Sequence, residues 1–320
     1  MHYGYTLMSE EHGPVELVRI AQEAEDRGFE LLVQSDHFHP WVHEQQHSPN
    51  CWVTLGAVAQ ATTSIALRTF VTCPFLRYHP AIVAQQAATL ACLSDGRFTL
   101  GVGAGERLNE HVVGRGWPPV DVRHEMLGES LDVISMLWSG GYQSYRGAHI
   151  TLEDARLFDL PEDPISIAIA VSGPESLEIA LAHADELIAT EPVPALIGEF
   201  RAAKGAAAGA CTQLPVVWAP TADAALETAH RMFRWSRLGW KVQAELPNPV
   251  NFDAAAQTVR PEDLADTIAH GPDVETYVQA VQRMADAGFD RLAFVQVGED
   301  QAGFMRFWTD ELQPALRDVG

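Results

Sequence analysis

Lysine is nearly absent from this chain: Lys204 and Lys241 are its two lysines among 320 residues. Acidic side chains outnumber basic ones by 43 to 21, which gives a formal net charge of −22 at pH 7. Nucleic-acid binding requires a basic face that neutralises phosphates and releases their counterions. The sequence indicates no such face, so we expect no nucleic-acid partner.

Long apolar runs are missing as well. No run approaches the roughly 18 apolar residues that indicate a membrane-spanning helix, and the N-terminus has no basic region followed by an apolar one. We therefore expect neither membrane insertion nor secretion. The cysteines (Cys51, Cys73, Cys92 and Cys211) stand far apart and form no CxxC pair. This spacing fits a reducing cytoplasm better than a disulfide framework or a zinc ribbon, so a cytoplasmic location is expected.

Apolar residues, which make up 47% of the chain, follow a regular alternation of strand and helix patterns. The predicted strands are continuously apolar, as is typical of parallel strands that are buried on both faces. Eight strand–helix repeats favour a (β/α)8 barrel, with a doubly wound sheet as the alternative. The strands are expected at 3–7, 29–33, 65–72, 97–102, 165–171, 186–189, 214–218 and 289–297, and the helices at 14–27, 52–62, 80–93, 123–138, 174–184, 194–208, 222–235 and 276–287.

Two stretches interrupt this alternation: 140–164 after the fourth strand and 239–271 after the seventh. We expect both inserts to lie over a barrel face, where they would shape a substrate pocket or an interface. No linker or low-complexity stretch divides the chain, so residues 1–320 are predicted to form a single domain.

The segment 35–41, with the sequence SDHFHPW, is the strongest indication of chemistry. It follows the predicted strand 29–33 and therefore lies at the strand's exit, where a parallel barrel opens to ligands. It supplies an acid, two imidazoles and an indole. Histidine can transfer a proton near neutral pH, and tryptophan offers a flat face or an N–H donor. The combination indicates catalysis more than packing.

Two metal-site patterns overlap this region, and both lack their structural context. His37 and His39 form an HxH at a strand end, as in barrel metallohydrolases, and residues 43–47 read HEQQH, like the HExxH of zinc proteases. The protease motif needs a helix that places both imidazoles on one face, but prolines flank it at 40 and 49. The hydrolase pattern needs further ligands at later strand ends. No metal is therefore expected, and a metal-dependent hydrolase is the less favoured alternative.

The glycine-rich stretch 101–106, GVGAGE, resembles a dinucleotide fingerprint but leads into a loop instead of directly into a helix. We interpret it as backbone that passes close to a flat ligand, with Glu106 and Asn109 facing the barrel mouth. A tight turn with solvated acids is the alternative. The sequence VSGP at 171–174 ends a strand and begins a helix, so its free amides suit a phosphate. Arg77 precedes the helix expected at 80–93 and would pair with surface acids.

Together, the segments 35–41, 77–81 (RYHPA), 101–106 and 108–110 (LNE) resemble the luciferase-like flavin and deazaflavin oxidoreductases. The resemblance is greatest to the branch that contains coenzyme F420-dependent glucose-6-phosphate dehydrogenase and F420-dependent secondary alcohol dehydrogenase. It implies a (β/α)8 barrel, usually a homodimer, that binds coenzyme F420 in the barrel mouth. A hydride would pass between this deazaflavin and a small-molecule alcohol or carbonyl substrate.

The resemblance also implies catalytic roles for residues at the mouth. His37 would be the base that takes the proton of an alcohol, and Trp41 would stabilise or position the reacting group. Glu106 would be the acid that completes proton transfer at the deazaflavin, and Glu10 matches a further acidic residue near the substrate pocket. Alcohol oxidation removes a hydride and a proton together, so a flat acceptor and an imidazole base suffice for it.

The family's cofactor contacts fall on a second set of residues. Asp36, Asn109 and the Phe70–Val71 peptide bond, which is a non-prolyl cis peptide in the family, would hold the deazaflavin ring. Ser172 and Gly173 would hold the phosphate of its tail. FMN, in a luciferase-like monooxygenase or reductase, is the alternative cofactor. A protein that binds the cofactor without catalysis is a further alternative.

One departure from the family concerns the substrate. The sugar-phosphate enzyme holds its substrate phosphate with basic residues on the later strands and the second insert. Here the sixth strand ends in TEP at 190–192, and the insert reads EDLADT at 262–267, with Lys241 as one nearby cation. Because acids replace the expected cations, glucose 6-phosphate is disfavoured, and a neutral alcohol, aldehyde or ketone is expected.

Overall fold

The computed structural model describes residues 1–317 and 319. Eight parallel strands form a closed barrel in the order β1-β2-β3-β4-β7-β8-β9-β11, because β8 pairs with β9 and β11 pairs back with β1. This closure confirms the (β/α)8 barrel over the doubly wound sheet. The barrel strands are β1 (His2–Leu7), β2 (Leu31–Gln34), β3 (Ala66–Thr69), β4 (Phe98–Val102), β7 (Ser166–Ala170), β8 (Glu186–Ile188), β9 (Gly209–Val217) and β11 (Arg291–Gln296).

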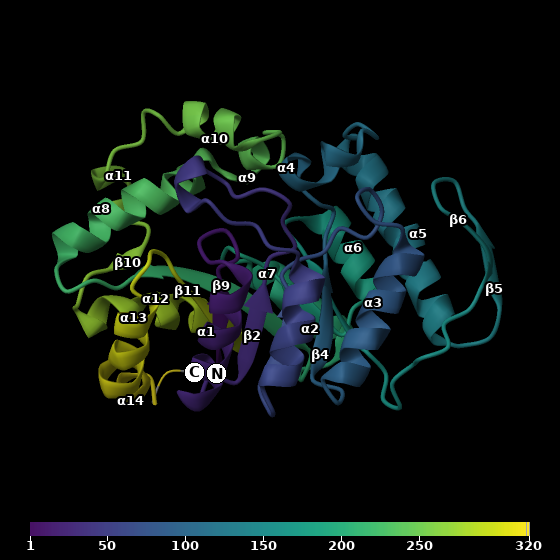
Figure 1. Cartoon of the computed structure of the whole chain (residues 1–320), viewed down its shortest axis with the longest axis horizontal. Helices are drawn as coiled ribbons and strands as arrows, with labels where there is room; N and C mark the ends of the chain where they lie inside the picture. The colour runs from purple at the N-terminus through teal and green to yellow at the C-terminus, as the bar shows by residue number, and fades with distance from the viewer. Residues whose placement is uncertain (318, 320) are drawn as a thin grey trace.

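Figure 1 shows helices around the outside of the barrel and a further group above the carboxyl ends of the strands. The helices are α1 (Pro14–Asp26), α2 (Cys51–Ala61), α3 (Pro80–Leu93), α4 (Arg107–Glu110), α5 (Val120–Trp138), α6 (Pro174–His183), α7 (Pro194–Lys204), α8 (Ala222–Phe233), α9 (Trp240–Gln243), α10 (Pro249–Ala255), α11 (Glu262–Ala265), α12 (Val274–Asp286), α13 (Gln301–Phe307) and α14 (Gln313–Ala315). Shorter elements are η1 (His43–Gln45), η2 (His111–Val113), η3 (Arg234–Leu238), η4 (Trp308–Leu312) and β10 (Ala269–His270).

The apolar side chains form three clusters. The largest lies between the strands and the surrounding helices and includes Leu32 and Trp308. A second lies at the barrel mouth, and a third, which includes Leu31 and Val33, fills the barrel interior. Successive residues of β2 thus point alternately into the barrel and toward the helices. Because both faces are buried, the strand sequence is apolar without alternation.

The seventh strand–helix unit differs from the sequence prediction. The helix expected at 222–235 forms as α8, but its buried side chains join the cluster at the barrel mouth. The helix that packs against β9 within the main core is α12, through Tyr277. Each helix has one apolar face, so the pattern does not show which one covers the barrel. Strand β9 also begins at Gly209 instead of 214, because Thr212 and Gln213 interrupt its apolar pattern.

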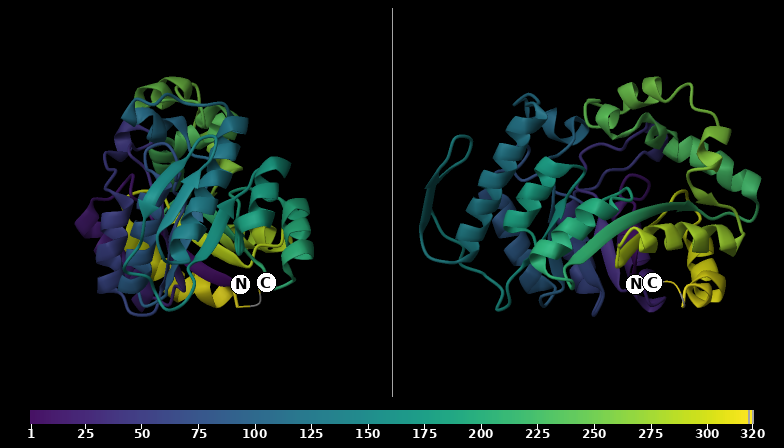
Figure 2. Two further views of the ribbon diagram at one scale, coloured as in Figure 1. Left: turned by 90° about the vertical axis from the view of Figure 1, so that its right-hand side faces the viewer. Right: turned by 180° about the vertical axis from the view of Figure 1, so that it is seen from behind.

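The two inserts take different positions. The second, 239–271, carries α9, α10 and α11 above the strand ends, and both views in Figure 2 show this cap. The first, 140–164, was expected over a barrel face, but it forms the antiparallel hairpin β5 (Gln143–Arg146) and β6 (Thr151–Ala155) beside α5. It leaves from the end of a helix and not from a strand. Glu129 on α5 holds its turn by accepting N–H bonds from residues 148, 149 and 150 at 2.7, 3.0 and 2.8 Å.

All four cysteines are free thiols. Over residues 1–317 and 319, no helix combines the length and the apolar character that a membrane crossing needs. The cytoplasmic location expected from the cysteine spacing stays a prediction.

The glycine-rich end of β4 packs against the end of β3. The Phe70–Val71 peptide bond is cis, as the resemblance implied. Beyond it, Thr72 N–H donates to the carbonyl oxygen of Gly101 at 2.9 Å, and Gly103 N–H donates to that of Thr72 at 3.1 Å. A Cβ at Gly101 would overlap the Thr69 carbonyl oxygen, and one at Gly103 would lie 2.8 Å from Val71 Cγ2. The glycines are therefore required by the approach of two strands, and the close approach of a flat ligand stays a prediction.

Gly101→Ala is expected to destabilise the protein by about 1–3 kcal/mol, the usual range for overpacking a filled site, because its methyl group would overlap the Thr69 carbonyl. Gly128→Ala on α5 is the control, since a Cβ there meets no atom within 4 Å. The control should gain roughly 0.5–1 kcal/mol, because alanine is the better helix former. Urea unfolding measures both variants, and wild-type stability of Gly101→Ala would contradict the packing argument.

Candidate active site

His37 lies between two carboxylates at the barrel mouth. It belongs to the loop after β2, whereas Glu10 and Glu106 belong to the loops after β1 and β4. His37 Nδ1 is 2.6 Å from Glu10 Oε1, and Nε2 is 3.6 Å from Glu106 Oε2. The shorter contact is an ion pair when His37 is protonated. Parallel strands end at the same side of a barrel, which explains how three separate loops bring these groups together.

The contact between His37 and Glu10 shifts the pKa of both side chains. Burial alone would raise the pKa of Glu10 and lower that of His37, but the attraction between them outweighs burial. The pKa of Glu10 is consequently lowered and that of His37 raised. At Glu106 burial has the largest effect and raises the pKa of the carboxyl. The charge of His37 lowers this pKa, and the charge of Glu10 raises it further. Below the raised pKa of His37 the mouth therefore holds an imidazolium–carboxylate pair beside a carboxyl group whose raised pKa favours its protonated form.

Trp41 forms an aromatic wall beside His37. Its ring meets the imidazole edge-on at a centroid distance of 5.1 Å. Its other contacts come from outside the loop: Trp235 stacks on it at 4.1 Å, and Phe252 meets it edge-on at 5.1 Å. Gln45 fixes the backbone at this point, because its Oε1 accepts the Trp41 N–H at 2.9 Å. Trp235 on η3, just before the second insert, and Phe252 on α10, within that insert, thus hold the indole in place.

Asn109 joins the loop of His37 to that of Glu106. Its Oδ1 accepts the N–H groups of Phe38 and His39 at 2.9 and 3.3 Å, and its Nδ2 donates to Glu106 Oε2 at 3.3 Å. The side chain of Asn109, which was predicted to hold the cofactor ring, thus already makes three hydrogen bonds within the protein. Its role in cofactor binding stays a prediction, but its bracing of both loops is a structural fact.

The other predicted cofactor contacts lie at the same end of the barrel. The Asp36 side chain is fully buried and accepts hydrogen bonds from four protein donors, namely Trp52, Thr72, Arg77 and Tyr78. Phe70 is buried and Val71 is partly exposed. At the start of α6, the Ser172 and Gly173 N–H groups donate to Ser176 Oγ at 3.0 and 3.2 Å. The donors left for an anion there are the exposed Ser172 hydroxyl and the first-turn amides of the helix.

The histidine-rich loop does not form either metal motif. Residues His43–Gln45 make a single 3-10 turn instead of the α-helix that HExxH needs. His43 Nδ1 lies 2.5 Å from Asp253 Oδ2, and His39 Nδ1 lies 3.0 Å from the Leu108 carbonyl oxygen. Within the described part of the chain, no cluster of three or more His, Cys, Asp or Glu side chains is arranged to hold a metal ion.

Sequence reasoning missed residues that shape this site. Phe252 lies far along the chain, and only the folded insert brings it to Trp41. Arg77 was expected to pair with surface acids, but it is largely buried and bonded to Asp36 and Glu110. Its place in the segment RYHPA, among the motifs that carry the resemblance, was the signal that pointed to it.

The chain belongs to the luciferase-like monooxygenase family, whose model matches residues 1–291. Among characterised relatives, the F420-dependent glucose-6-phosphate dehydrogenase of Microbacterium testaceum (strain StLB037) is 33% identical over 99% of this chain and 98% of its own length. The F420-dependent glucose-6-phosphate dehydrogenase of Mycobacterium avium (strain 104) is 32% identical over 99% of this chain and 98% of its own.

Solved structures show the same relationship. An F420-dependent secondary alcohol dehydrogenase in complex with an F420–acetone adduct superposes with a TM-score of 0.90, at 28% identity and over 99% of both chains. Monooxygenase RslO1 from Streptomyces bottropensis superposes with a TM-score of 0.74, at 16% identity over 98% of this chain and 99% of its own. At the lower identity the likeness shows the fold alone.

Glu10→Gln is expected to lower the pKa of His37 below its ordinary value of 6.5, because burial then acts without the opposing carboxylate. NMR titration of the imidazole in the free protein measures this change. Glu16→Gln is the control, since it removes the partner of His12 (3.2 Å) and should leave His37 unaffected. An unchanged His37 titration in Glu10→Gln would show that the ion pair does not set the charge.

The same pair predicts a pH dependence of stability. The raised pKa of His37 stabilises the fold fully below pH 6.5, and this contribution is lost as the pH rises through the folded pKa. The lowered pKa of Glu10 contributes above pH 4.5 and is lost on acidification. The stability difference between wild type and Glu10→Gln should therefore be largest between about pH 4.5 and 6.5, as measured by urea unfolding.

Proposed function

We propose that the protein is a coenzyme F420-dependent oxidoreductase that transfers a hydride between the deazaflavin and a neutral alcohol or carbonyl substrate. The observation that carries the proposal is the position of His37 between Glu10 and Glu106 at the barrel mouth. Full-length similarity to an F420-dependent secondary alcohol dehydrogenase and to F420-dependent glucose-6-phosphate dehydrogenases supports it.

The barrel mouth suits a flat ring on the side formed by β3, β4 and β7. The interior side chains of β7 there, Ala168 and Ala170, are small, the larger Phe70 at the end of β3 is buried, and Val71 and Ala170 keep part of their surface exposed. Gly103 lies between them and would meet both if it carried a Cβ. Bound F420 would supply the atom that accepts or donates the hydride. The residues proposed to hold its ring and tail are Asp36, Phe70, Val71, Asn109, Ser172 and Gly173.

In this proposal His37 is the proton-transfer group. Its Nδ1 is engaged by Glu10, so Nε2 is the atom that takes the proton of the substrate hydroxyl. Glu106 lies 3.6 Å from Nε2 and, with its raised pKa, can hold a second proton. Trp41 orients the imidazole from the side. Since oxidation needs neutral His37, its rate should rise as the pH rises through the raised pKa, and carbonyl reduction should show the opposite trend.

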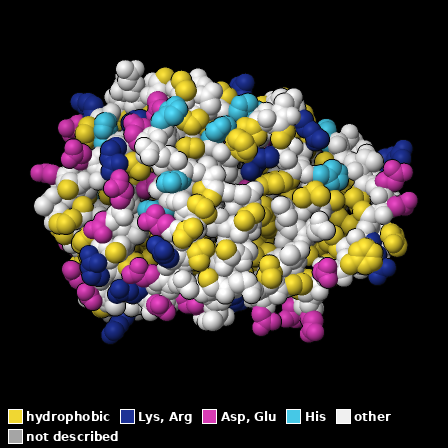
Figure 3. All heavy atoms as spheres, viewed as in Figure 1, with side chains coloured by type: hydrophobic (Ala, Val, Ile, Leu, Met, Phe, Trp, Pro, Cys, Tyr) yellow, Lys and Arg dark blue, Asp and Glu magenta, His cyan; other side chains and the backbone are white. Residues whose placement is uncertain are grey.

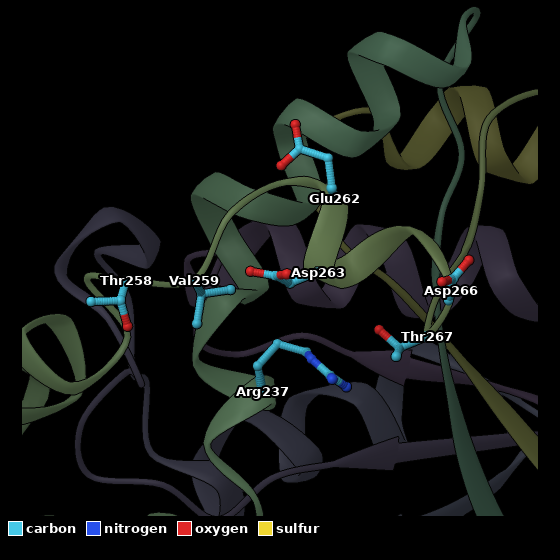
Figure 4. Close-up of a pocket in the computed structure, with 7 residues that line it drawn as sticks. All are labelled: Arg237, Thr258, Val259, Glu262, Asp263, Asp266 and Thr267. Atoms are coloured by element: carbon cyan, nitrogen blue, oxygen red, sulfur yellow. The ribbon is translucent and has the colours of Figure 1, made fainter.

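The charges around the mouth support a substrate without a phosphate. The cation that acts on His37 is Arg77, and its guanidinium is already bonded to Asp36. Figure 4 shows Arg237, on η3 just before the second insert, in a pocket whose lining includes three carboxylates of that insert, those of Glu262, Asp263 and Asp266. Lys241 is exposed on α9. An anionic group would meet net repulsion here, whereas a neutral alcohol, aldehyde or ketone would not.

Equilibrium titration with F420 and with FMN, followed by an alcohol and carbonyl screen, tests the proposal. We expect F420 to bind more tightly and the wild type to turn over a neutral substrate. His37→Ala should lose roughly 10²–10⁴-fold in kcat, the range for a general base, and should keep its F420 affinity. His43→Ala, an exposed histidine of the same loop, is the control. Preferential FMN binding, or full activity of His37→Ala, would overturn the proposal.

We also propose that the active form is a homodimer that meets through α2 and α3. Neither helix contains a charged residue, and their outer faces expose Val53 (74%), Ile82 (47%) and Leu93 (43%). In Figure 3 this region is mostly white and yellow, whereas charged side chains crowd the left of the view. Two copies that each carry a charge of −22 repel one another, so a neutral face is where they can meet.

The variant Val53→Glu/Ile82→Glu is expected to be monomeric, because it places like charges on both sides of the proposed interface. Size-exclusion chromatography with light scattering measures the mass. Val250→Glu is the control, since Val250 is 63% exposed on α10, away from this face. A monomeric wild type, or a dimer that survives the paired substitution, would rule out this interface.

A further inference from the structure

A buried network of charged side chains lies behind His37 and takes no part in the proposed proton transfer. It consists of Asp36, Arg77 and Glu110, whose side chains are 0%, 9% and 2% exposed. Arg77 Nη2 donates to Asp36 Oδ1 at 2.9 Å and to the Asp36 carbonyl oxygen at 2.5 Å. The Arg77 backbone N–H donates to Glu110 Oε2 at 3.0 Å, and its Nε lies 3.6 Å from Glu110 Oε1.

On one side the network fixes the loop that carries His37. Asp36 is the residue directly before His37, and its carboxylate also accepts the Thr72 hydroxyl at 2.8 Å and the Trp52 indole N–H at 3.2 Å. Thr72 follows the Phe70–Val71 bond, and Trp52 lies on α2. The loop after β2 is therefore tied both to the end of β3 and to the helical layer.

On the other side the network fixes the loop that carries Glu106. Glu106 is the N-cap of α4, and Glu110 is the last residue of that short helix. Burial raises the pKa of the Glu110 carboxyl to about 7, although Arg77 opposes this rise. Without the Arg77 side chain this carboxyl would keep the backbone N–H of residue 77 but lose the guanidinium that faces it in a buried place.

We propose that Arg77 is a positioning residue that sets the separation of His37 and Glu106 by binding one loop through Asp36 and the other through Glu110. The inference rests on the proposed function. Asn109 links the same loops nearer the mouth, and Arg77 does so from the interior. A lysine cannot replace it: guanidinium donates in several fixed directions, whereas an ammonium group at the end of a flexible stem offers a single point charge.

Arg77→Lys tests the proposal, because it keeps the charge and removes the fixed geometry. We expect kcat to fall on the order of 10²-fold, as a displacement of about 1 Å can cause, with a smaller change in KM. The His37 titration, followed by NMR in the cofactor-free protein, should also shift. Arg97→Lys is the matched control: Arg97 donates to four backbone carbonyls and one hydroxyl at the opposite end of the barrel. It should lose stability without any change in the His37 titration.

Glu110→Gln is the second variant and serves if Arg77→Lys does not fold. This variant keeps an acceptor for the Arg77 N–H but removes the charge beside the guanidinium. We therefore expect kcat and the pKa of His37 to change in the same direction as in Arg77→Lys, but by a smaller amount. A folded variant of either kind with wild-type kcat and wild-type His37 titration would overturn the proposal. The titration needs neither cofactor nor substrate, so a wild type that fails to bind F420 would refute the proposed function without deciding the positioning role.

Discussion

The buried ion pair between Glu10 and His37 is the constraint on which the rest of the barrel mouth depends. Moving two charged groups out of water costs several kcal/mol for each ion, and their attraction offsets this only when the geometry is well fixed. The two residues come from loops after different strands, so neither loop can move alone without leaving a buried charge unpaired. The pair therefore demands rigid loops, and the surrounding structure supplies them.

That rigidity comes from side chains that bond to backbone. Asn109 accepts the N–H groups of Phe38 and His39, and Gln45 accepts that of Trp41, so the loop after β2 is held on both sides of Pro40. Arg77 donates to the carbonyl oxygen before His37. Such contacts fix the loop through its backbone, and the imidazole's Nε2 stays on the side of Glu106, 3.6 Å from its Oε2.

The sequence predicted correctly those features that depend on local patterns of residues. Continuous apolar runs predicted the barrel strands, and strand ends converge in a parallel barrel, so His37 and Glu106 were expected at one mouth, whereas Glu10 was expected near them from the family resemblance. The sequence did not predict features that depend on tertiary packing. Both α8 and α12 have one apolar face, and nothing in either shows which covers the strands. The burial of Arg77 depends on Asp36 and Glu110, which come from other loops and leave no periodic signal.

The second insert packs beside the proposed proton-transfer group. Trp41 contacts Phe252 of the insert and Trp235 just before it, and the insert is anchored to α4, where Arg107 N–H donates to the Ala244 carbonyl oxygen at 3.0 Å. Beside this apolar cover the His37 side chain is 10% exposed, and such burial strengthens the charge interactions that it makes. The same residues would line the space for a substrate. A change in the insert that admits a larger or more polar molecule would therefore also alter the proton affinity of His37.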